Sequence, residues 1–325
     1  MKKVIFENVG VPSEVLKVVD APIPEPKKGE IRVKVIATNV NPSDVMFIHG
    51  FYGLQPKLPS CAGFEGVGTI DAVGEGLEFP KGMRVSFTNI EGTWTEYAIV
   101  PANAIIPIPE AMPDQVAAQL FINPFTAFAL LHESQLQEGD FLLLTAGGST
   151  FAQLVIQIAA KRGIKTICSV RRNDQIEQLK TLGAFAVINT KEEKLHKKVL
   201  ELTNGKGIPC CMDAVGGELA DEILKCLSYN GKVLAYGMLS LQESVISNGL
   251  MIFKNLTVKG FWLSSWLGNA EKSEREMIAK NVVTMLTSGQ LKLNVEATYS
   301  IDEVVKAVNH SNSEGRKGKI LITMN

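Results

Sequence analysis

The spacing of hydrophobic positions changes once along the chain. Up to about residue 118, short apolar stretches alternate with Gly and Pro, as at 31–37, 67–73, 83–87 and 96–100. Such spacing is typical of short β-strands separated by turns. We therefore predict a β-rich unit in this part of the chain.

From about residue 119, apolar runs alternate with helical patterns. The strand-like runs stand at 141–145, 165–170, 185–188, 209–214, 232–236 and 256–259. The clearest helix follows the first run, with apolar residues at i, i+3, i+4, i+7 and i+8 from Phe151. Ser149 or Thr150 is its expected N-cap, and Gly163 its expected end. Strands alternating with helices predict a parallel, doubly wound α/β sheet.

The remaining residues predict two helices and a strand, at 270–287, 301–309 and 319–323. They are too few for a core of their own, so we expect them to complete the β-rich unit. The predicted fold class is α/β. A β-domain of residues 1–118 with 262–325 would carry a doubly wound domain, residues 119–261, inserted in it.

The amino-acid composition excludes some classes of function for this chain. The 325 residues, 46% of them hydrophobic, suit two globular domains, and 33 Lys+Arg against 34 Asp+Glu leave a formal net charge of −1. This balance excludes bulk-charge binding of nucleic acid. Glu7 interrupts the first apolar stretch, and no later run has the ~18 apolar residues that a membrane span needs. We expect a soluble, cytoplasmic protein whose partner is a small molecule, with no membrane contact.

The five cysteines do not form a ligand or disulfide pattern. Their number is odd and they contain no CxxC pair, which argues against a disulfide framework and a structural zinc site. Cys210 and Cys211 are adjacent, but they lie within an apolar run. We interpret them as buried packing residues rather than a redox pair.

The turn between the run at 141–145 and the helix after it is a candidate phosphate-binding loop. Such a turn presents backbone N–H groups and the positive end of a helix to a pyrophosphate. Where the dinucleotide pattern expects glycines, this loop has Thr150 and Ala152, so we expect the Ser149 and Thr150 hydroxyls to act as donors. The predicted loop residues are Gly147, Gly148, Ser149, Thr150, Phe151 and Ala152.

The next strand ends in Ser169, Val170, Arg171 and Arg172. An acidic residue here would bind the ribose 2′-hydroxyl of NAD, whereas arginine suits a 2′-phosphate. We therefore assign Ser169, Arg171 and Arg172 to the cofactor site and predict NADPH as the cofactor. The alternative is a solvated arginine pair that Asp174 neutralises.

Motifs in the first half of the chain resemble a known superfamily. They are Asn-Pro-Ser-Asp at 41–44, His-Gly-Phe-Tyr-Gly at 49–53 and Gly-Phe-Glu-Gly-Val-Gly at 63–68. Their combination resembles the medium-chain dehydrogenase/reductases, which join a GroES-like β-barrel domain to a Rossmann domain, and the resemblance covers essentially the whole chain. Zinc-dependent members have a metal-binding histidine where this chain has Phe64. A phenyl ring cannot bind zinc, so we predict no metal.

Two longer stretches, 41–59 and 253–266, resemble the mitochondrial-type enoyl-CoA/enoyl-ACP reductases. The resemblance implies that Tyr52 is the proton donor and that Phe261, Trp262 and Leu263 line the nicotinamide. It further implies cofactor contacts from Asn41, Asn123, Thr126, Tyr236, Gly237, Met238 and Lys319, and a substrate pocket that includes Phe51 and Trp266.

A tyrosine suits the chemistry of such a reductase. After hydride adds to the β-carbon of an enoyl thioester, the α-carbon needs a proton. A phenol, with an unperturbed pKa of about 10, is protonated at neutral pH. The alternative is that Tyr52 is an ordinary loop aromatic.

Glu65 is interpreted as structural, and Asp213 as either a helix cap or a ligand at a strand end.

The predicted function is NADPH-dependent reduction of the C=C bond of an enoyl thioester or related α,β-unsaturated carbonyl compound. One alternative is an NADPH:quinone oxidoreductase, in which no carbon is protonated. Another is a cofactor-binding protein with little catalysis. The resemblance also implies a homodimer formed by the edges of two Rossmann sheets.

Overall fold

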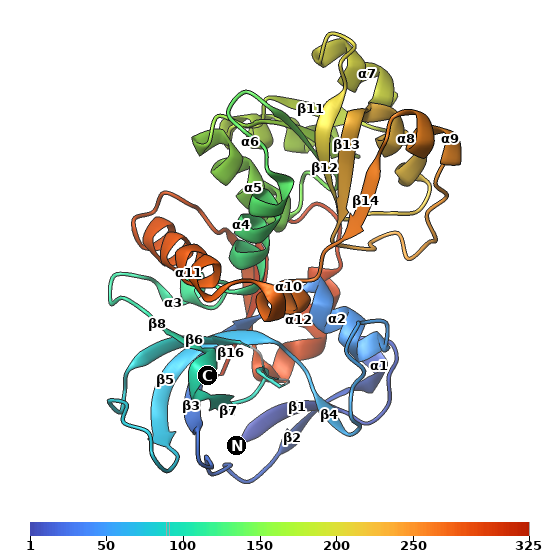
Figure 1. Ribbon diagram of the computed structural model, residues 1–325. Coiled ribbons are helices and arrows are strands. Elements are labelled where there is room, and N and C mark those ends of the chain that lie inside the picture. Colours follow the sequence, from blue (N-terminus) through green and yellow to red (C-terminus); the bar gives the residue numbers. More distant parts are fainter. Residues whose placement is uncertain (89, 91, 325) are drawn as a thin grey trace. The chain divides into compact units, whose positions relative to one another are not determined.

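The computed structural model describes residues 1–88, 90 and 92–324, which form two compact units (Figure 1). Each unit is described by itself below. Among the described residues, no helix is both long enough and apolar enough to traverse a lipid bilayer.

Unit 1 consists of Met1–Asn123 and Val283–Asn325, and unit 2 of Pro124–Val282. Unit 2 is thus inserted in sequence between the two segments of unit 1. The second boundary differs from the predicted one at residue 262. The predicted helix 270–287 is α11 (Lys272–Thr287). A further helix, α10 (Leu263–Asn269), precedes it.

Side-chain bonds explain why residues 262–282 belong to unit 2. The Nε1–H of Trp266 on α10 donates to Oε1 of Glu133 at 3.2 Å, and Nε2 of His132 lies 3.2 Å from Oε1 of Glu274 on α11. Glu133 and His132 are on α4 (Ile122–Ser134), most of which is in unit 2. These long-range bonds attach α10 and α11 to unit 2.

Unit 2 contains the predicted parallel sheet. Its strand order is β11-β10-β9-β12-β13-β14, and every pairing is parallel. The order reverses between β9 and β12, and in such sheets ligands bind outside the carboxyl ends of the strands at this point. The strands are β9 (Phe141–Leu144), β10 (Lys165–Val170), β11 (Ala186–Asn189), β12 (Ile208–Asp213), β13 (Leu227–Ala235) and β14 (Thr257–Gly260).

Helices cover both faces of this sheet, with α5 and α6 on one side and α7 and α8 on the other (Figure 1). α5 matches its predicted pattern: Ser149 is the N-cap, and Gly163, at φ 69°, follows the helix end. Cys210 and Cys211 of β12 are fully buried, and burial raises the pKa of the Cys210 thiol to about 12. The helices are α5 (Thr150–Lys161), α6 (Ile176–Thr181), α7 (Leu195–Leu202), α8 (Leu219–Cys226) and α9 (Asn248–Phe253), with a 3₁₀ turn at Asn173–Gln175.

Unit 1 is built on β-sheets. In the larger sheet the order is β15-β16-β3-β5-β6-β8, and β7 also pairs with β3; in the other sheet β1 lies between β2 and β4. The register of β3 against β5 shifts at two places, which bends this long strand. The strands are β1 (Lys2–Phe6), β2 (Leu16–Asp20), β3 (Glu30–Asn39), β4 (Ser60–Cys61), β5 (Glu65–Val73), β6 (Arg84–Thr88), β7 (Tyr97–Pro101), β8 (Ile105–Pro107), β15 (Val295–Ser300) and β16 (Lys319–Thr323).

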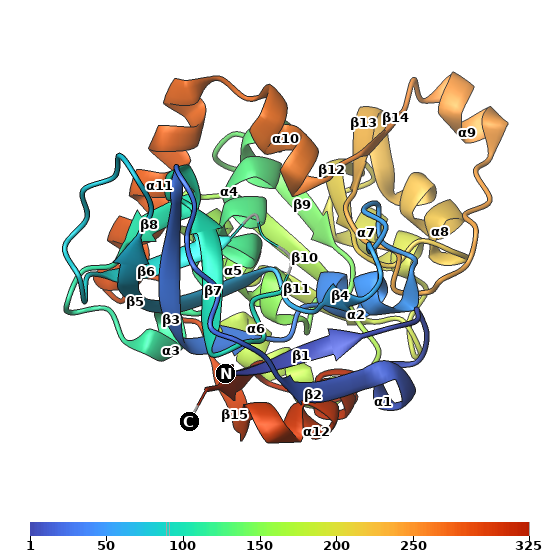
Figure 2. The same cartoon turned by 90° about the horizontal axis from the view of Figure 1, so that it is seen from below.

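Short helices close the core of unit 1. α12 packs against β15 and β16, and α1 lies beside α12 (Figure 2). The core includes Phe6, Phe47, Phe87 and Trp94, all fully buried. The helices are α1 (Pro12–Val15), α2 (Pro42–His49), α3 (Asp114–Ala117) and α12 (Val304–Ser311), with 3₁₀ turns at Ala102–Ala104 and Ile301–Glu303.

Candidate active site

The loop between β9 and α5 begins with two tightly packed glycines. The N–H of Gly147 donates to the carbonyl of Ser169 at 2.8 Å, and a Cβ on Gly147 would lie 2.7 Å from the Cβ of Cys168. A Cβ on Gly148 would collide with the side chain of Gln175. Packing therefore requires glycine at position 147, whereas at position 148 the flexible end of the Gln175 side chain can move aside. The N–H of Gly147 is used inside the protein, and the place of Gly147 in the cofactor-binding loop stays a prediction.

The start of α5 is the part of this loop best suited to an anion. Oγ of Ser149 accepts a hydrogen bond from the N–H of Ala152 at 3.1 Å, so the hydroxyl hydrogen itself stays available to a ligand. Thr150 and Phe151 form the first turn of the helix. Because the N-terminal end of a helix carries partial positive charge, this turn can hold a pyrophosphate.

Two exposed arginines follow β10. Nε and Nη2 of Arg172 donate to the carboxylate of Asp174 at 2.9 and 2.7 Å, so the pairing considered as an alternative is present for this arginine. Arg171 is exposed, and Ser169 is buried with its carbonyl bonded to Gly147. Arg171 stays the predicted ligand of a 2′-phosphate, and Arg172 is occupied by its ion pair.

Asp213, at the end of β12, forms a hydrogen bond to the residue after β9, and the strand order of the sheet reverses between these two strands. Its carboxylate accepts from Oγ1 of Thr145 at 2.6 Å and from the N–H groups of Val215 and Gly216 at 2.9 and 3.0 Å. Thr145 follows β9, and Asp213 ends β12. Because α8 begins only at Leu219, Asp213 shapes the loop before that helix and does not cap it. The sequence placed this residue at a strand end but could not show its partner.

The loops after β13 and β14 complete this edge of the sheet. The ring of Tyr236 lies 4.5 Å from the ring of Phe151, centroid to centroid, and burial raises the pKa of the Tyr236 hydroxyl well above its ordinary value. The N–H groups of Tyr236 and Gly237 donate to the carbonyl of Asp213 at 2.9 and 3.3 Å. Phe261 donates its N–H to Ala235 at 2.8 Å. Phe151 is thus a packing partner of the β13 loop.

The other predicted site residues of unit 2 lie on α4, on α10 and in the loops after β13 and β14. Thr126 is on the second turn of α4, which begins in unit 1 with Ile122 and Asn123. Trp262 and Met238 are exposed, at 42% and 44%. Leu263 and Trp266 are half-buried on α10, and the indole N–H of Trp266 is directed to Glu133.

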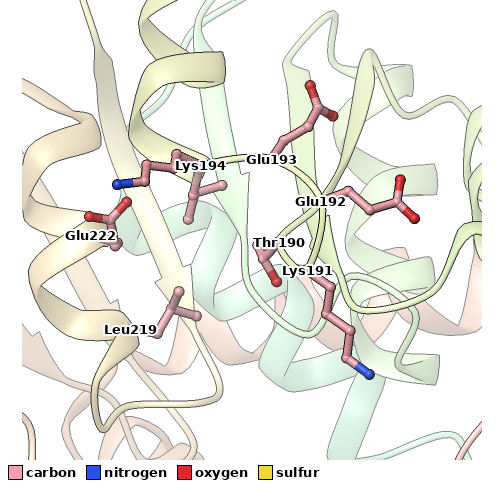
Figure 3. A pocket seen from close by; sticks show the side chains of 8 residues that line it. Thr190, Lys191, Glu192, Glu193, Lys194, Leu219 and Glu222 are labelled. Atoms are coloured by element: carbon pink, nitrogen blue, oxygen red, sulfur yellow. The ribbon is translucent and has the colours of Figure 1, made fainter.

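A cavity of about 340 Å³ lies beside the carboxyl end of β11 (Figure 3). The side chains of Lys194 and Glu222 point toward each other in it, whereas those of Glu192 and Glu193 point away. No motif in the sequence indicated this cavity. The available signal was that residues 190–195 follow the third predicted strand of the alternating strands and helices. Its lining residues are Thr190, Lys191, Glu192, Glu193, Lys194, Leu195, Leu219 and Glu222.

In unit 1, Tyr52 is supported by a row of aromatic rings. Its ring lies 5.5 Å from Phe64 at an interplanar angle of 33°, and Phe64 lies 5.1 Å edge-on from Phe47, which is fully buried. Tyr52 itself is half-buried against the core. Phe51 is 58% exposed and stacks on His49 at 5.7 Å. Phe64 therefore supports the predicted proton donor.

Glu65 is a structural carboxylate, as the sequence suggested. It is 1% exposed and accepts from the side-chain amides of Asn39 and Asn41 at 2.8 and 2.9 Å. It also accepts from the N–H groups of Phe121 and Ile122 at 3.0 and 2.9 Å. With these donors the carboxylate stabilises the start of α4 and is not placed to act as a base.

Lys319 is buried beside Asn41, and its contact with the cofactor stays a prediction. It is 3% exposed, and its ammonium donates to Oδ1 of Asn41. Asn41 is 1% exposed and precedes α2, where its N–H donates to Oδ2 of Asp44 at 2.7 Å. Burial raises the pKa of Asp44 and lowers that of Lys319, both to about 8. These polar groups fix the start of the helix that leads to Tyr52.

Comparison with known proteins places the chain in a family. Residues 27–110 match the alcohol dehydrogenase GroES-like domain, and residues 152–281 match the zinc-binding dehydrogenase domain. The chain is 33% identical to the mitochondrial enoyl-[acyl-carrier-protein] reductase of Rattus norvegicus, over 100% of the chain and 89% of that protein. The chain belongs to the medium-chain dehydrogenase/reductase superfamily. It is an oxidoreductase, and the predicted pairing of a GroES-like and a Rossmann domain is confirmed.

Other members of the superfamily are similar over the whole chain. The Arabidopsis thaliana mitochondrial enoyl-[acyl-carrier-protein] reductase is 33% identical, covering 99% of the chain and 88% of that protein. A Bacillus thuringiensis structure described as an NADPH:quinone reductase has a TM-score of 0.94 at 32% identity, covering 100% and 99% of the two chains. The Escherichia coli quinone oxidoreductase complexed with NADPH has a TM-score of 0.92 at 25% identity, covering 99% and 100%.

Although one matching domain is named for zinc, the residues of this superfamily member do not fit that metal. Among the described residues, no group of three or more His, Cys, Asp or Glu side chains could hold a metal ion. Phe64, where zinc-dependent members have a histidine, packs on Tyr52 and Phe47 instead.

Proposed function

We propose that this protein is an NADPH-dependent reductase of the C=C bond in enoyl thioesters and related α,β-unsaturated carbonyl compounds. The observation that carries the proposal is the support of Tyr52 by Phe64, whose phenyl ring cannot bind a metal ion. A phenol held there supplies a proton without a metal. The enoyl-[acyl-carrier-protein] reductases that match the whole chain support the choice of thioester.

Each residue in this proposal has one task. NADPH, when bound, supplies the hydride that adds to the β-carbon. Tyr52 donates its hydroxyl proton to the α-carbon, and the resulting phenolate regains a proton from water. Phe64 keeps the Tyr52 ring in place, and Asn41 fixes the helix before it. The hydride brings the electron pair of the new C–H bond at the β-carbon, the π pair of the C=C bond forms the new C–H bond at the α-carbon, and the thioester stays intact.

The residues of unit 2 fit the proposed cofactor. The N-terminal turn of α5 would hold the pyrophosphate, with Ser149 and Thr150 as hydroxyl donors. Arg171 would bind the 2′-phosphate. The cavity after β11, which lies next to β10 in the sheet, would take the adenosine end. Phe261, Trp262 and Leu263 would line the nicotinamide.

A second candidate is reduction of quinones in the same site. Structures similar over the whole chain are named NADPH:quinone reductase or quinone oxidoreductase. A quinone takes its protons on oxygen, from water, and does not need Tyr52. Steady-state oxidation of NADPH with crotonyl-CoA and with benzoquinone separates the two: we expect the higher kcat/KM for crotonyl-CoA. A higher kcat/KM for benzoquinone, unaffected by Tyr52→Phe, would reverse the order.

Phe64→Leu tests the support of Tyr52. Leucine keeps much of the apolar volume but removes the ring on which Tyr52 lies, so the hydroxyl loses its fixed position. Because small misplacements of reacting groups are costly, we expect kcat for crotonyl-CoA to fall roughly tenfold or more. The dissociation constant of NADPH, measured by fluorescence titration, should stay within about twofold. An unchanged kcat in a folded variant would show that Phe64 does not position Tyr52.

We further propose that the enzyme is a homodimer in which two copies of β14 pair. β14 is the last strand in the order of its sheet, and all its residues are exposed. Beside it in sequence, Ile252 and Phe253 are 70% and 82% exposed. An open strand edge with large exposed apolar residues favours association, and two-fold pairing covers this edge on both copies at once.

Phe253→Asp tests this assembly. A carboxylate on each copy would be buried at the interface, so we expect the variant to be monomeric where the parent protein is dimeric. Light scattering coupled to size-exclusion chromatography at micromolar concentration measures the mass. Ile23→Asp, which changes an exposed apolar residue of unit 1, is the control and should remain dimeric. A parent protein with monomer mass would refute the proposal.

A further inference from the structure

The Glu133 carboxylate bonds to Lys259 and Trp266, which lie on either side of one short stretch of chain. Its Oε2 lies 2.5 Å from Nζ of Lys259 on β14, and its Oε1 accepts the indole N–H of Trp266 on α10 at 3.2 Å. The main-chain carbonyl of Glu133 also accepts from Nζ of Lys232 on β13 at 3.2 Å. One residue near the end of α4 therefore contacts β13, β14 and α10.

The stretch between these two bonds contains the segment assigned to the nicotinamide. Lys259 lies two residues before Phe261, and Trp266 lies three residues after Leu263. The chain passes from β14 directly into α10 (Figure 1). The N–H of Trp266 also donates to the carbonyl of Trp262 at 2.9 Å, so the first turn of α10 joins these two residues. A shift of Trp266 would therefore move Trp262 with it.

The charge and exposure of these groups favour a positioning role over a stabilising one. The Lys259 side chain is 55% exposed and that of Glu133 is 24% exposed, and the ammonium of Lys259 holds the pKa of Glu133 below its ordinary value. An ion pair this exposed contributes little to folding, because water and salt screen it. The indole bond is directional and is made to a charged acceptor, so it fixes the orientation of the Trp266 ring.

We propose that Glu133 is a positioning residue for the reduction: through Trp266 and Lys259 it holds the segment Phe261–Trp262–Leu263 against the nicotinamide ring. This inference rests on the proposed function, because that function places the segment at the ring. Glu133 itself touches neither cofactor nor substrate in this proposal. It acts by fixing both sides of the segment, so that hydride donor and substrate meet at a constant distance.

A series of variants separates the two bonds. Glu133→Ala removes both bonds, Trp266→Phe removes the indole bond, and Lys259→Met removes the ion pair. Glu133→Gln keeps an oxygen acceptor for the indole and loses the charge. Glu274→Gln is the matched control, because it weakens the pairing of α4 with α11 through His132 and leaves the segment alone.

We expect Glu133→Ala and Trp266→Phe to lower kcat for crotonyl-CoA by roughly tenfold or more, with KM for NADPH changed by less than about threefold. The primary isotope effect with 4-deuterated NADPH should rise, because hydride transfer becomes slower relative to the other steps. Glu133→Gln should recover most of kcat. Combining Glu133→Ala with Trp266→Phe should cost no more than Glu133→Ala alone, since both remove the same bond.

Bound NADPH provides a readout that does not need turnover. The emission maximum and lifetime of the nicotinamide depend on its surroundings, so both should change in Glu133→Ala and stay unchanged in Glu274→Gln. This result supports the inference even if the parent enzyme reduces neither crotonyl-CoA nor benzoquinone, in which case only the proposed function fails. Unchanged emission in Glu133→Ala, or an equal loss of kcat in Glu274→Gln, would overturn the role of Glu133.

Discussion

Replacing Tyr52 with Phe is expected to lower kcat for crotonyl-CoA reduction by about 10²–10⁴-fold, the usual contribution of a positioned general acid. The variant keeps the ring, so the packing on Phe64 persists and the fold should be unaffected. Only the hydroxyl proton is lost, and the α-carbon must then take its proton from water. Initial rates of NADPH oxidation at saturating crotonyl-CoA measure the effect.

Two comparisons make the Tyr52 result specific. Tyr97→Phe removes a hydroxyl from β7, elsewhere in unit 1, and should leave kcat within about twofold. Benzoquinone reduction by Tyr52→Phe should also persist, because that reaction needs no proton on carbon. If Tyr52→Phe reduces crotonyl-CoA as fast as the parent enzyme, Tyr52 is an ordinary loop aromatic and another group donates the proton.

Arg171→Glu is expected to weaken NADPH binding by about ten- to a hundredfold more than NADH binding. A hydrogen bond to a charged group contributes about 1.5–3 kcal/mol, and the introduced carboxylate adds repulsion of the 2′-phosphate. NADH has no 2′-phosphate and should lose little. Dissociation constants for both nucleotides, from fluorescence titration, give the ratio directly. The difference should shrink as salt is added, because Arg171 is exposed.

Arg172 is the matched control for Arg171. Its guanidinium is already paired with Asp174, so Arg172→Gln should change the NADPH:NADH ratio much less than Arg171→Gln. Equal losses for both nucleotides in Arg171→Glu would mean that this strand end does not recognise the 2′-phosphate. The preference would then have to arise elsewhere, with Lys191 and Lys194 of the β11 cavity as charged candidates.

The α/β unit could be predicted well because its signals are local. The strand β10 has the bounds that the sequence predicted, and α5 has its predicted N-cap and a glycine after its end. α4 was not predicted, because apolar residues occupy almost every side of it and leave no 3.6-residue period. α2 was missed as well, although Pro42 after Asn41 and Asp44 three residues on are ordinary helix-start signals.

The site was predictable in position but less so in detail. Strand ends and motifs indicated the loop before α5, Arg171 and Tyr52. The sequence could not show that Ser169 accepts the N–H of Gly147, or that Lys319 is buried on Asn41. These partners lie far apart in sequence, and only the fold brings them together. For the same reason Glu133 carried no signal, because Lys259 and Trp266 follow it by more than a hundred residues.

The origin of the two new hydrogens in the product tests the central claim most directly. Crotonyl-CoA is reduced with NADPH carrying deuterium at both C4 positions, or with ordinary NADPH in D₂O, and the butyryl-CoA is analysed by mass spectrometry and NMR. The account predicts one deuterium at the β-carbon in the first case and one at the α-carbon in the second. NADPH oxidation that yields no butyryl-CoA, or nicotinamide deuterium found at the α-carbon, would contradict it.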